Sequence, residues 1–171
     1  MNTLEPWQVS QIKRIQASLI GHGILIILVA LFAGIMLGFS LVEGIKLWPF
    51  VDISMEIPGS TRGWKAAHIG GLLNGIMMIA VALCLPKVRL VSKRLTFTYW
   101  TFVLTGWGNT IFYWAGNFSM NRGLSVGATR FGEGDIFGAV AYLVVSPVML
   151  ITIMGCWVLM RQSFNAAKKT I

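Results

Sequence analysis

The sequence predicts an all-α integral membrane protein with four transmembrane helices, and three observations support this. Of the 171 residues, 56% are hydrophobic and 12% are charged, a charged share about half that of a soluble domain. The mean hydropathy is +0.72. The apolar residues gather in runs of about 20 residues, the length that a helix needs to cross the hydrocarbon layer. Strands of a membrane barrel would be about half as long and would alternate in polarity.

Each apolar run predicts one helix. In chain order, the runs cover about 17–41, 66–85, 95–115 and 136–160. The first run is too long for the apolar part of a cleaved signal peptide, so we interpret it as a helix that is kept. Pro86 is expected to end the second helix, because proline removes a backbone donor. The length favours a single membrane domain over residues 1–171.

The basic residues predict the orientation of the helices. The N-terminal arm, the second loop and the C-terminal tail hold Lys13, Arg14, Lys87, Arg89, Lys93, Arg94, Arg161, Lys168 and Lys169. The first and third loops hold fewer lysines and arginines, so the positive-inside rule places both termini in the cytoplasm. Because the net charge of +8 comes largely from the ends of apolar runs, it indicates lipid headgroups as its partners and no nucleic acid.

The two cysteines, Cys84 and Cys156, lie inside apolar runs, and the chain has no CxxC, CxxCH or zinc-type motif. This pattern predicts neither a disulfide framework nor covalent attachment of haem.

Two histidines, His22 and His68, are also placed within apolar runs. Helical spacing puts Trp64 and Gly71 on the same face as His68. This face would admit a flat macrocycle, or it would pack another helix through Gly71-x-x-x-Gly75. The histidines belong to opposite sides of the membrane, roughly 10–20 Å apart in depth. One histidine ligand with an open sixth position therefore fits a haem better than two ligands from one chain.

Polar residues on the third helix recur at steps of four: Thr105, Asn109, Tyr113 and Asn117. Asn74 adds an amide on the second helix. Such groups either hydrogen-bond helices together or orient a ligand in an apolar pocket. In the third loop, Arg122 and Arg130 would neutralise haem propionates or remain solvated, and Asp135 is expected to cap the fourth helix.

Four blocks of the sequence resemble bacterial styrene oxide isomerases, in the same order and spacing. They are Gly21-His22-Gly23-Ile24-Leu25, Pro58-Gly59-Ser60-x-x-Gly63-Trp64-x-x-Ala67-His68, Gly106-Trp107-x-Asn109-x-x-Phe112-Tyr113 and Gly132-x-Gly134-Asp135-Ile136-Phe137-Gly138. The second block continues through Asn74 and the third through Arg122. The resemblance covers nearly the whole chain.

The resemblance implies a homotrimer in the bacterial cytoplasmic membrane that binds ferric haem b. Its members convert small aryl epoxides such as styrene oxide to aldehydes such as phenylacetaldehyde, by a Meinwald rearrangement without net oxidation, in styrene degradation. The resemblance assigns the iron to His68 and the placing of the epoxide to Asn74 and Tyr113.

The expected haem-binding set is His68, Trp64, Gly71 and Arg122, and the expected catalytic set is Tyr113, Asn74, Thr105 and Asn109. One departure concerns Thr105, which stands where the family leads us to expect an aspartate.

Two other functions remain open. A haem b electron-transfer protein would use His22 and His68 from different subunits, and a scaffold without cofactor would use the glycines and amides only to pack helices.

Overall fold

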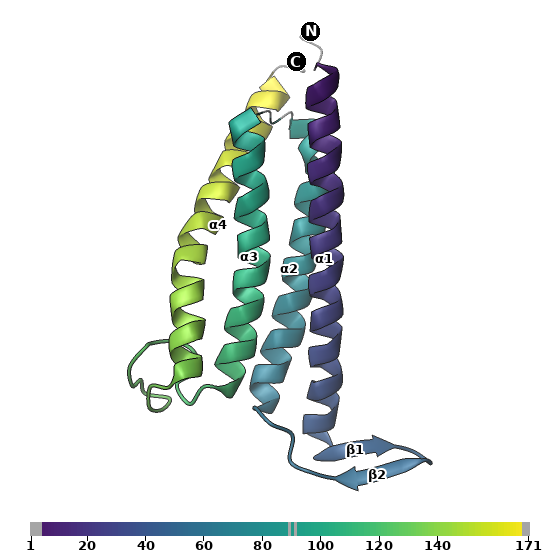
Figure 1. Cartoon of the computed structure of the whole chain (residues 1–171), viewed down its shortest axis with the longest axis vertical. Helices are drawn as coiled ribbons and strands as arrows, with labels where there is room; N and C mark the ends of the chain where they lie inside the picture. Colours follow the sequence, from purple (N-terminus) through teal and green to yellow (C-terminus); the bar gives the residue numbers. More distant parts are fainter. Residues whose placement is uncertain (1–4, 89, 91, 169–171) are drawn as a thin grey trace.

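The structure is a computed structural model that describes residues 5–88, 90 and 92–168. Four long helices make up most of it: α1 (Pro6–Leu41), α2 (Thr61–Val88), α3 (Ser92–Phe118) and α4 (Ile136–Lys168). They run side by side along the long axis, with α1 beginning and α4 ending at the same end of the bundle (Figure 1). The single-domain organisation and the cytoplasmic placement of the termini stay predictions. Arg89 and Lys169, two of the basic residues used for orientation, lie outside the described residues.

The four predicted helices are present, but they extend past the apolar runs. The first helix begins at Pro6 and not near residue 17, because a capping box formed by Glu5 and Gln8 supports its polar first turns. The backbone nitrogen of Glu5 donates to Oε1 of Gln8 at 2.9 Å. The expected stop at Pro86 was wrong, since α2 continues to Val88. A proline this close to a helix end interrupts little of the remaining backbone ladder.

The loop between α1 and α2 contains a hairpin that the sequence did not predict. Strands β1 (Gly44–Leu47) and β2 (Val51–Ser54) pair antiparallel, with Gly44 opposite Ser54. Its tip carries Trp48 and Phe50, which are 92% and 89% exposed. Each strand has four residues, which is the shortest length at which alternation of apolar and polar residues indicates a strand.

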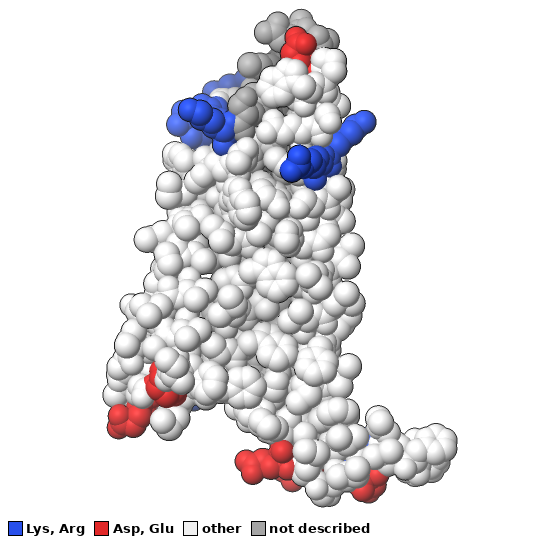
Figure 2. All heavy atoms as spheres, viewed as in Figure 1, with Lys and Arg blue, Asp and Glu red and all other residues white. Residues whose placement is uncertain are grey.

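Three helices, α1, α2 and α4, are long and apolar enough to cross a membrane among the residues that the structure describes. Helix α3 is nearly as long as α2, but its sequence is more polar. It carries buried threonines at 98, 101, 105 and 110, which face its neighbours. In the view of Figure 2, basic side chains gather near the end where α1 begins, most acidic ones lie at the opposite end, and the band between them is uncharged. This charge distribution suits a membrane protein.

The main core lies among α1, α2 and α3, in the half of the bundle where α1 begins and α4 ends. Its largest fully buried side chains include Leu19, Ile26, Met78, Leu85 and Phe102. The other half of the bundle, nearest the hairpin, holds a smaller cluster around Trp64. The polar residues that the sequence predicts for the site lie in or beside that second half.

Candidate functional site

His68 lies on the face of α2 that packs against α1. A Cβ atom built on Gly34 of α1 would come within 2.6 Å of Nδ1 of the His68 ring. The same nitrogen lies 2.9 Å from the backbone carbonyl oxygen of Ala30. The glycine therefore lets the ring approach the backbone of α1 closely enough for a side-chain to main-chain hydrogen bond.

The Ala30 contact defines which nitrogen of the His68 ring carries a proton. A carbonyl oxygen only accepts, so Nδ1 must donate. In a neutral imidazole Nε2 then keeps its lone pair, and no hydrogen bond occupies it among the described residues. A ring nitrogen whose opposite N–H is tied to a backbone carbonyl is the usual arrangement of a histidine metal ligand.

The neighbours of His68 on the same face are engaged in packing. A Cβ atom on Gly71 would lie 2.7 Å from the Cβ of Ala30, so α1 covers this glycine. For Gly71, the helix-packing alternative is the one that this structure shows. The indole of Trp64 donates to the carbonyl of Pro58 at 2.9 Å and meets Trp114 edge-on at 5.3 Å between ring centroids.

Asn74, Asn109 and Tyr113 come together on a different face of α2, the one toward α3. Asn74 is 7% exposed, donates through Nδ2 to the carbonyl of Gly70 at 2.7 Å and accepts from Nδ2 of Asn109 at 2.9 Å. The ring of Tyr113 lies against Gly70, in the space that a side chain there would fill. The sequence placed these three side chains in one set but gave no signal for Gly70, whose role depends on α3.

Thr105 is separate from that set. The residue is 1% exposed. Its hydroxyl donates to the carbonyl of Thr101 at 2.7 Å and lies 2.7 Å from the hydroxyl of Thr152 on α4. Four residues exceed one helical turn by about 40°, so a stripe at steps of four rotates around the helix. The stripe consequently begins against α4 at Thr105 and reaches α2 at Asn109 and Tyr113.

Asn117, the last member of the stripe, holds the start of α2. Its Oδ1 accepts from the backbone nitrogen of Ser60 at 2.8 Å and from the Ser60 hydroxyl at 3.2 Å. The Ser60 hydroxyl in turn accepts from the backbone nitrogen of Gly63 at 3.0 Å, as an N-cap does. Side chains on Gly59 or Gly63 would collide with the Asn117 amide.

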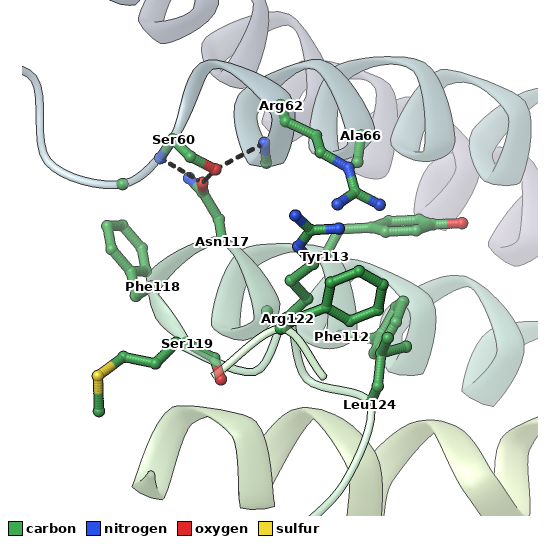
Figure 3. Close-up of a pocket in the computed structure, with 15 residues that line it drawn as sticks. Ser60, Arg62, Ala66, Phe112, Tyr113, Asn117, Phe118, Ser119, Arg122 and Leu124 are labelled. Atoms are coloured by element: carbon green, nitrogen blue, oxygen red, sulfur yellow. Dashed lines mark hydrogen bonds between the residues drawn. The ribbon is translucent and has the colours of Figure 1, made fainter. Parts of the chain in front are cut away.

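A cavity of about 620 Å³ opens beside these residues, at the start of α2 and the end of α3. Its walls include Phe112, Tyr113 and Phe131, and the guanidinium groups of Arg62 and Arg122 reach into the same part of it (Figure 3). Arg122 has a φ of 65° and stacks its guanidinium 3.9 Å from the Phe131 ring centroid. Arg62 was missed by sequence reasoning, because a single arginine in a helix start has no pattern of its own.

A second cavity, of about 660 Å³, lies between α3 and α4. Asn109 and Tyr113 form its polar corner, and the rest of its wall is mainly apolar, with Met149, Ile153 and Trp157 from α4. An apolar pocket with a few convergent polar groups is the usual form of a small-molecule site.

Asp135 ties the loop between α3 and α4 to the start of α4, as predicted. Its Oδ1 accepts from the backbone nitrogen of Gly138 at 2.7 Å, and its Oδ2 accepts from the nitrogen of Met120 at 2.6 Å. The bond from Gly138 is the main cause that lowers the pKa of the Asp135 carboxyl below its ordinary 3.8, and the bonds from Met120 and Ser119 act in the same direction, against the effect of burial.

His22 lies apart from His68 and meets α3. The indole nitrogen of Trp107 donates to Nδ1 of His22 at 3.2 Å. Cys84 and Cys156 are both exposed free cysteines, and no disulfide joins residues that the structure describes.

Comparison with known proteins identifies the family. A family profile described as styrene oxide isomerase matches residues 15–164. A styrene-oxide isomerase of Pseudomonas fluorescens is 39% identical over 148 residues, which cover 86% of this chain and 86% of that protein. The resemblance seen in the sequence is confirmed: the chain belongs to the styrene oxide isomerase family and is an isomerase.

Proposed function

We propose that this protein converts aryl epoxides such as styrene oxide to aldehydes such as phenylacetaldehyde, by a Meinwald rearrangement at ferric haem b. Membership of the family supports the reaction class. The observation that carries the haem proposal is the hydrogen bond between Nδ1 of His68 and the carbonyl of Ala30, which leaves Nε2 to bind a metal.

His68 would hold the haem iron through Nε2, and fewer of its neighbours would contact the haem than the sequence suggested. Trp64 and Gly71 lie on the His68 face but pack against protein, so in our proposal they shape this face without being open to a macrocycle. Arg122 would supply a positive charge for a propionate. When bound, ferric haem supplies a Lewis acid with one open coordination position.

The side chains on the α3 face would orient the substrate. In the rearrangement the bond from oxygen to the benzylic carbon breaks, a hydride moves to that carbon from its neighbour, and an aldehyde forms with no atom gained or lost. The Tyr113 hydroxyl and the Asn74 amide would donate to the epoxide oxygen as negative charge develops on it. The apolar wall from α4 would keep water from trapping the benzylic cation as a diol.

Homotrimeric assembly is part of the proposal, and the placement of residues on α2 supports it. Six residues separate His68 from Asn74, which turns Asn74 by about 240° around the helix axis. His68 is occupied on the α1 side and Asn74 on the α3 side. Contact between neighbouring copies would bring His68 of one copy and Asn74 of the next copy to one site.

We further propose that all four helices span the bacterial cytoplasmic membrane with both termini inside. Helix α3 has 27 residues and α2 has 28, so α3 is long enough to cross the same thickness as α2. Its polar residues bond to α2 and α4 and need not face lipid.

The deciding experiment measures phenylacetaldehyde formation from styrene oxide by purified protein, first oxidised and then reduced with dithionite. Aldehyde from the ferric form that falls on reduction supports the proposal. A haem-loaded ferric sample that makes no aldehyde contradicts it. A low-spin, six-coordinate spectrum in such a sample would favour the electron-transfer alternative, and a colourless active protein would contradict the haem assignment alone.

A further inference from the structure

The amide of Asn74 has a direction that is fixed by the backbone. The carbonyl of Gly70 can only accept, so the atom of Asn74 that lies 2.7 Å from it must be the NH2 group. The oxygen of Asn74 therefore faces Asn109. Asn109 must then present its own NH2 group, at 2.9 Å, because two amide oxygens would repel.

This chain of bonds leaves one hydrogen of Asn74 unused. The NH2 group carries two hydrogens, and the carbonyl of Gly70 takes one of them. No second acceptor for this group occurs among the described residues. The side chain is only 7% exposed, so a hydrogen held there is available to an acceptor inside the bundle and is poorly served by bulk water.

Gly70 also fixes the position of a second hydrogen-bond donor, the hydroxyl of Tyr113. The Tyr113 ring occupies the position where a Cβ atom on Gly70 would lie, and its hydroxyl oxygen is 2.9 Å from that position. One residue of α2 thus anchors the Asn74 amide through its carbonyl and seats the Tyr113 ring through its missing side chain.

We propose that Asn109 is a positioning residue that holds the Asn74 amide with its free N–H toward the reacting oxygen of the substrate. The torsion that turns an asparagine amide has broad minima, so it takes partners at both ends to define it. Gly70 holds the nitrogen end and Asn109 holds the oxygen end. This inference rests on the proposed function, which places an epoxide oxygen near Asn74.

Five variants test the role of Asn109: Asn109→Leu, Asn109→Asp, Asn109→Gln, Asn74→Leu and the double variant Asn74→Leu/Asn109→Leu. Asn109→Leu keeps the size and removes the donor, and Asn109→Asp replaces the donor with an acceptor. Thr110→Val is the matched control, because it deletes a buried hydrogen bond of the same helix, to the carbonyl of Gly106, outside the site.

We expect kcat for styrene oxide to fall about tenfold or more in Asn109→Leu, since one hydrogen bond to an oxygen that gains charge is at stake. KM should rise several-fold, because the same hydrogen bond is already made to the epoxide oxygen of the bound substrate. Asn109→Asp should lose at least as much, and Asn109→Gln, which keeps an amide donor, should recover part of the loss. The double variant should be no worse than Asn74→Leu alone. Losses that multiply in the double variant would show independent packing roles and overturn the proposal.

A binding measurement separates this inference from the proposed function. Tryptophan fluorescence would report binding of styrene oxide and of ethylbenzene, which has a similar shape without the oxygen. We expect Asn109→Leu and Asn74→Leu to weaken styrene oxide binding several-fold and to leave ethylbenzene unchanged, even if the wild type makes no aldehyde. Equal weakening of both ligands, or a wild type that does not distinguish them, would overturn the role of Asn109.

Discussion

The two faces of α2 hold their functional residues in different ways. Toward α1, glycines bring the helices so close that His68 bonds directly to the backbone of Ala30. Toward α3, a chain of side-chain amides links Asn74 to Asn109, and only one end of that chain reaches a backbone group. A backbone partner moves only with its helix, whereas a side-chain partner is lost by a single substitution. The α1 face is therefore suited to hold a ligand atom, and the α3 face to set the direction of donors.

Replacing His68 should give the largest effect and separates the two faces most clearly. We expect His68→Ala to lower turnover of styrene oxide by about 10³-fold or more, because a metal Lewis acid contributes several kcal/mol. Haem absorption of the purified protein should disappear with it. His22→Ala is the control, since His22 bonds to Trp107 and not to the α1–α2 contact. Full activity in His68→Ala would remove the α1 face from the mechanism.

On the α3 face, Tyr113→Phe removes one donor without changing the ring that lies on Gly70. The loss of a hydrogen bond to developing negative charge should lower kcat by about 10- to 100-fold. Haem content should remain at the wild-type level, which absorption of the same sample checks. If haem content fell together with kcat, the two faces would not act separately.

The packing of the α1 face is tested by Gly71→Ala. The added carbon would meet the Cβ of Ala30 at 2.7 Å, so the helices must move apart, and we expect a loss of about 1–3 kcal/mol in unfolding free energy. Thermal unfolding in detergent measures it. Gly21→Ala on α1 is the matched control, because nothing lies within 4 Å of its Cβ position. There alanine should be neutral or stabilise the helix by about 1 kcal/mol.

The smallest effect is expected at Asp135, which joins the loop after α3 to the start of α4. Asp135→Asn keeps one oxygen and so loses either the bond from Gly138 or that from Met120. We expect a stability loss of about 1 kcal/mol near neutral pH. Because the pKa of the carboxyl is lowered in the folded protein, its contribution is complete above 3.8 and declines as the pH falls through the lower folded value. A difference in Tm that persisted unchanged in acid would contradict this account.

Hydropathy predicted the four helices well, because each apolar run forms the greater part of one helix. It missed the start of α1, since the turns from Pro6 onward are helical although they precede the apolar run. It also missed the hairpin, whose strands are four residues each. The set of Asn74, Asn109 and Tyr113 followed from spacing and from the family resemblance.

The parts of the site that were missed depend on tertiary contacts. Thr105 was grouped with Asn109 because steps of four look like a stripe, although the 40° excess per step turns it toward α4. Gly70 shows its role only when Tyr113 is placed on it. Arg62 joins Arg122 only through the folding of the third loop over the start of α2.

Asn117 lies wedged between Gly59 and Gly63, where no side chain fits beside its amide. Substitutions at these three positions are therefore coupled. A relative with a larger residue at 59 or 63 would need a smaller residue at 117, together with another hydrogen-bond acceptor for Ser60. Substitutions at the start of α2 and at the end of α3 should therefore occur together. Chimeras that exchange only one of the two segments with a distant homologue should fold less well than chimeras that exchange both.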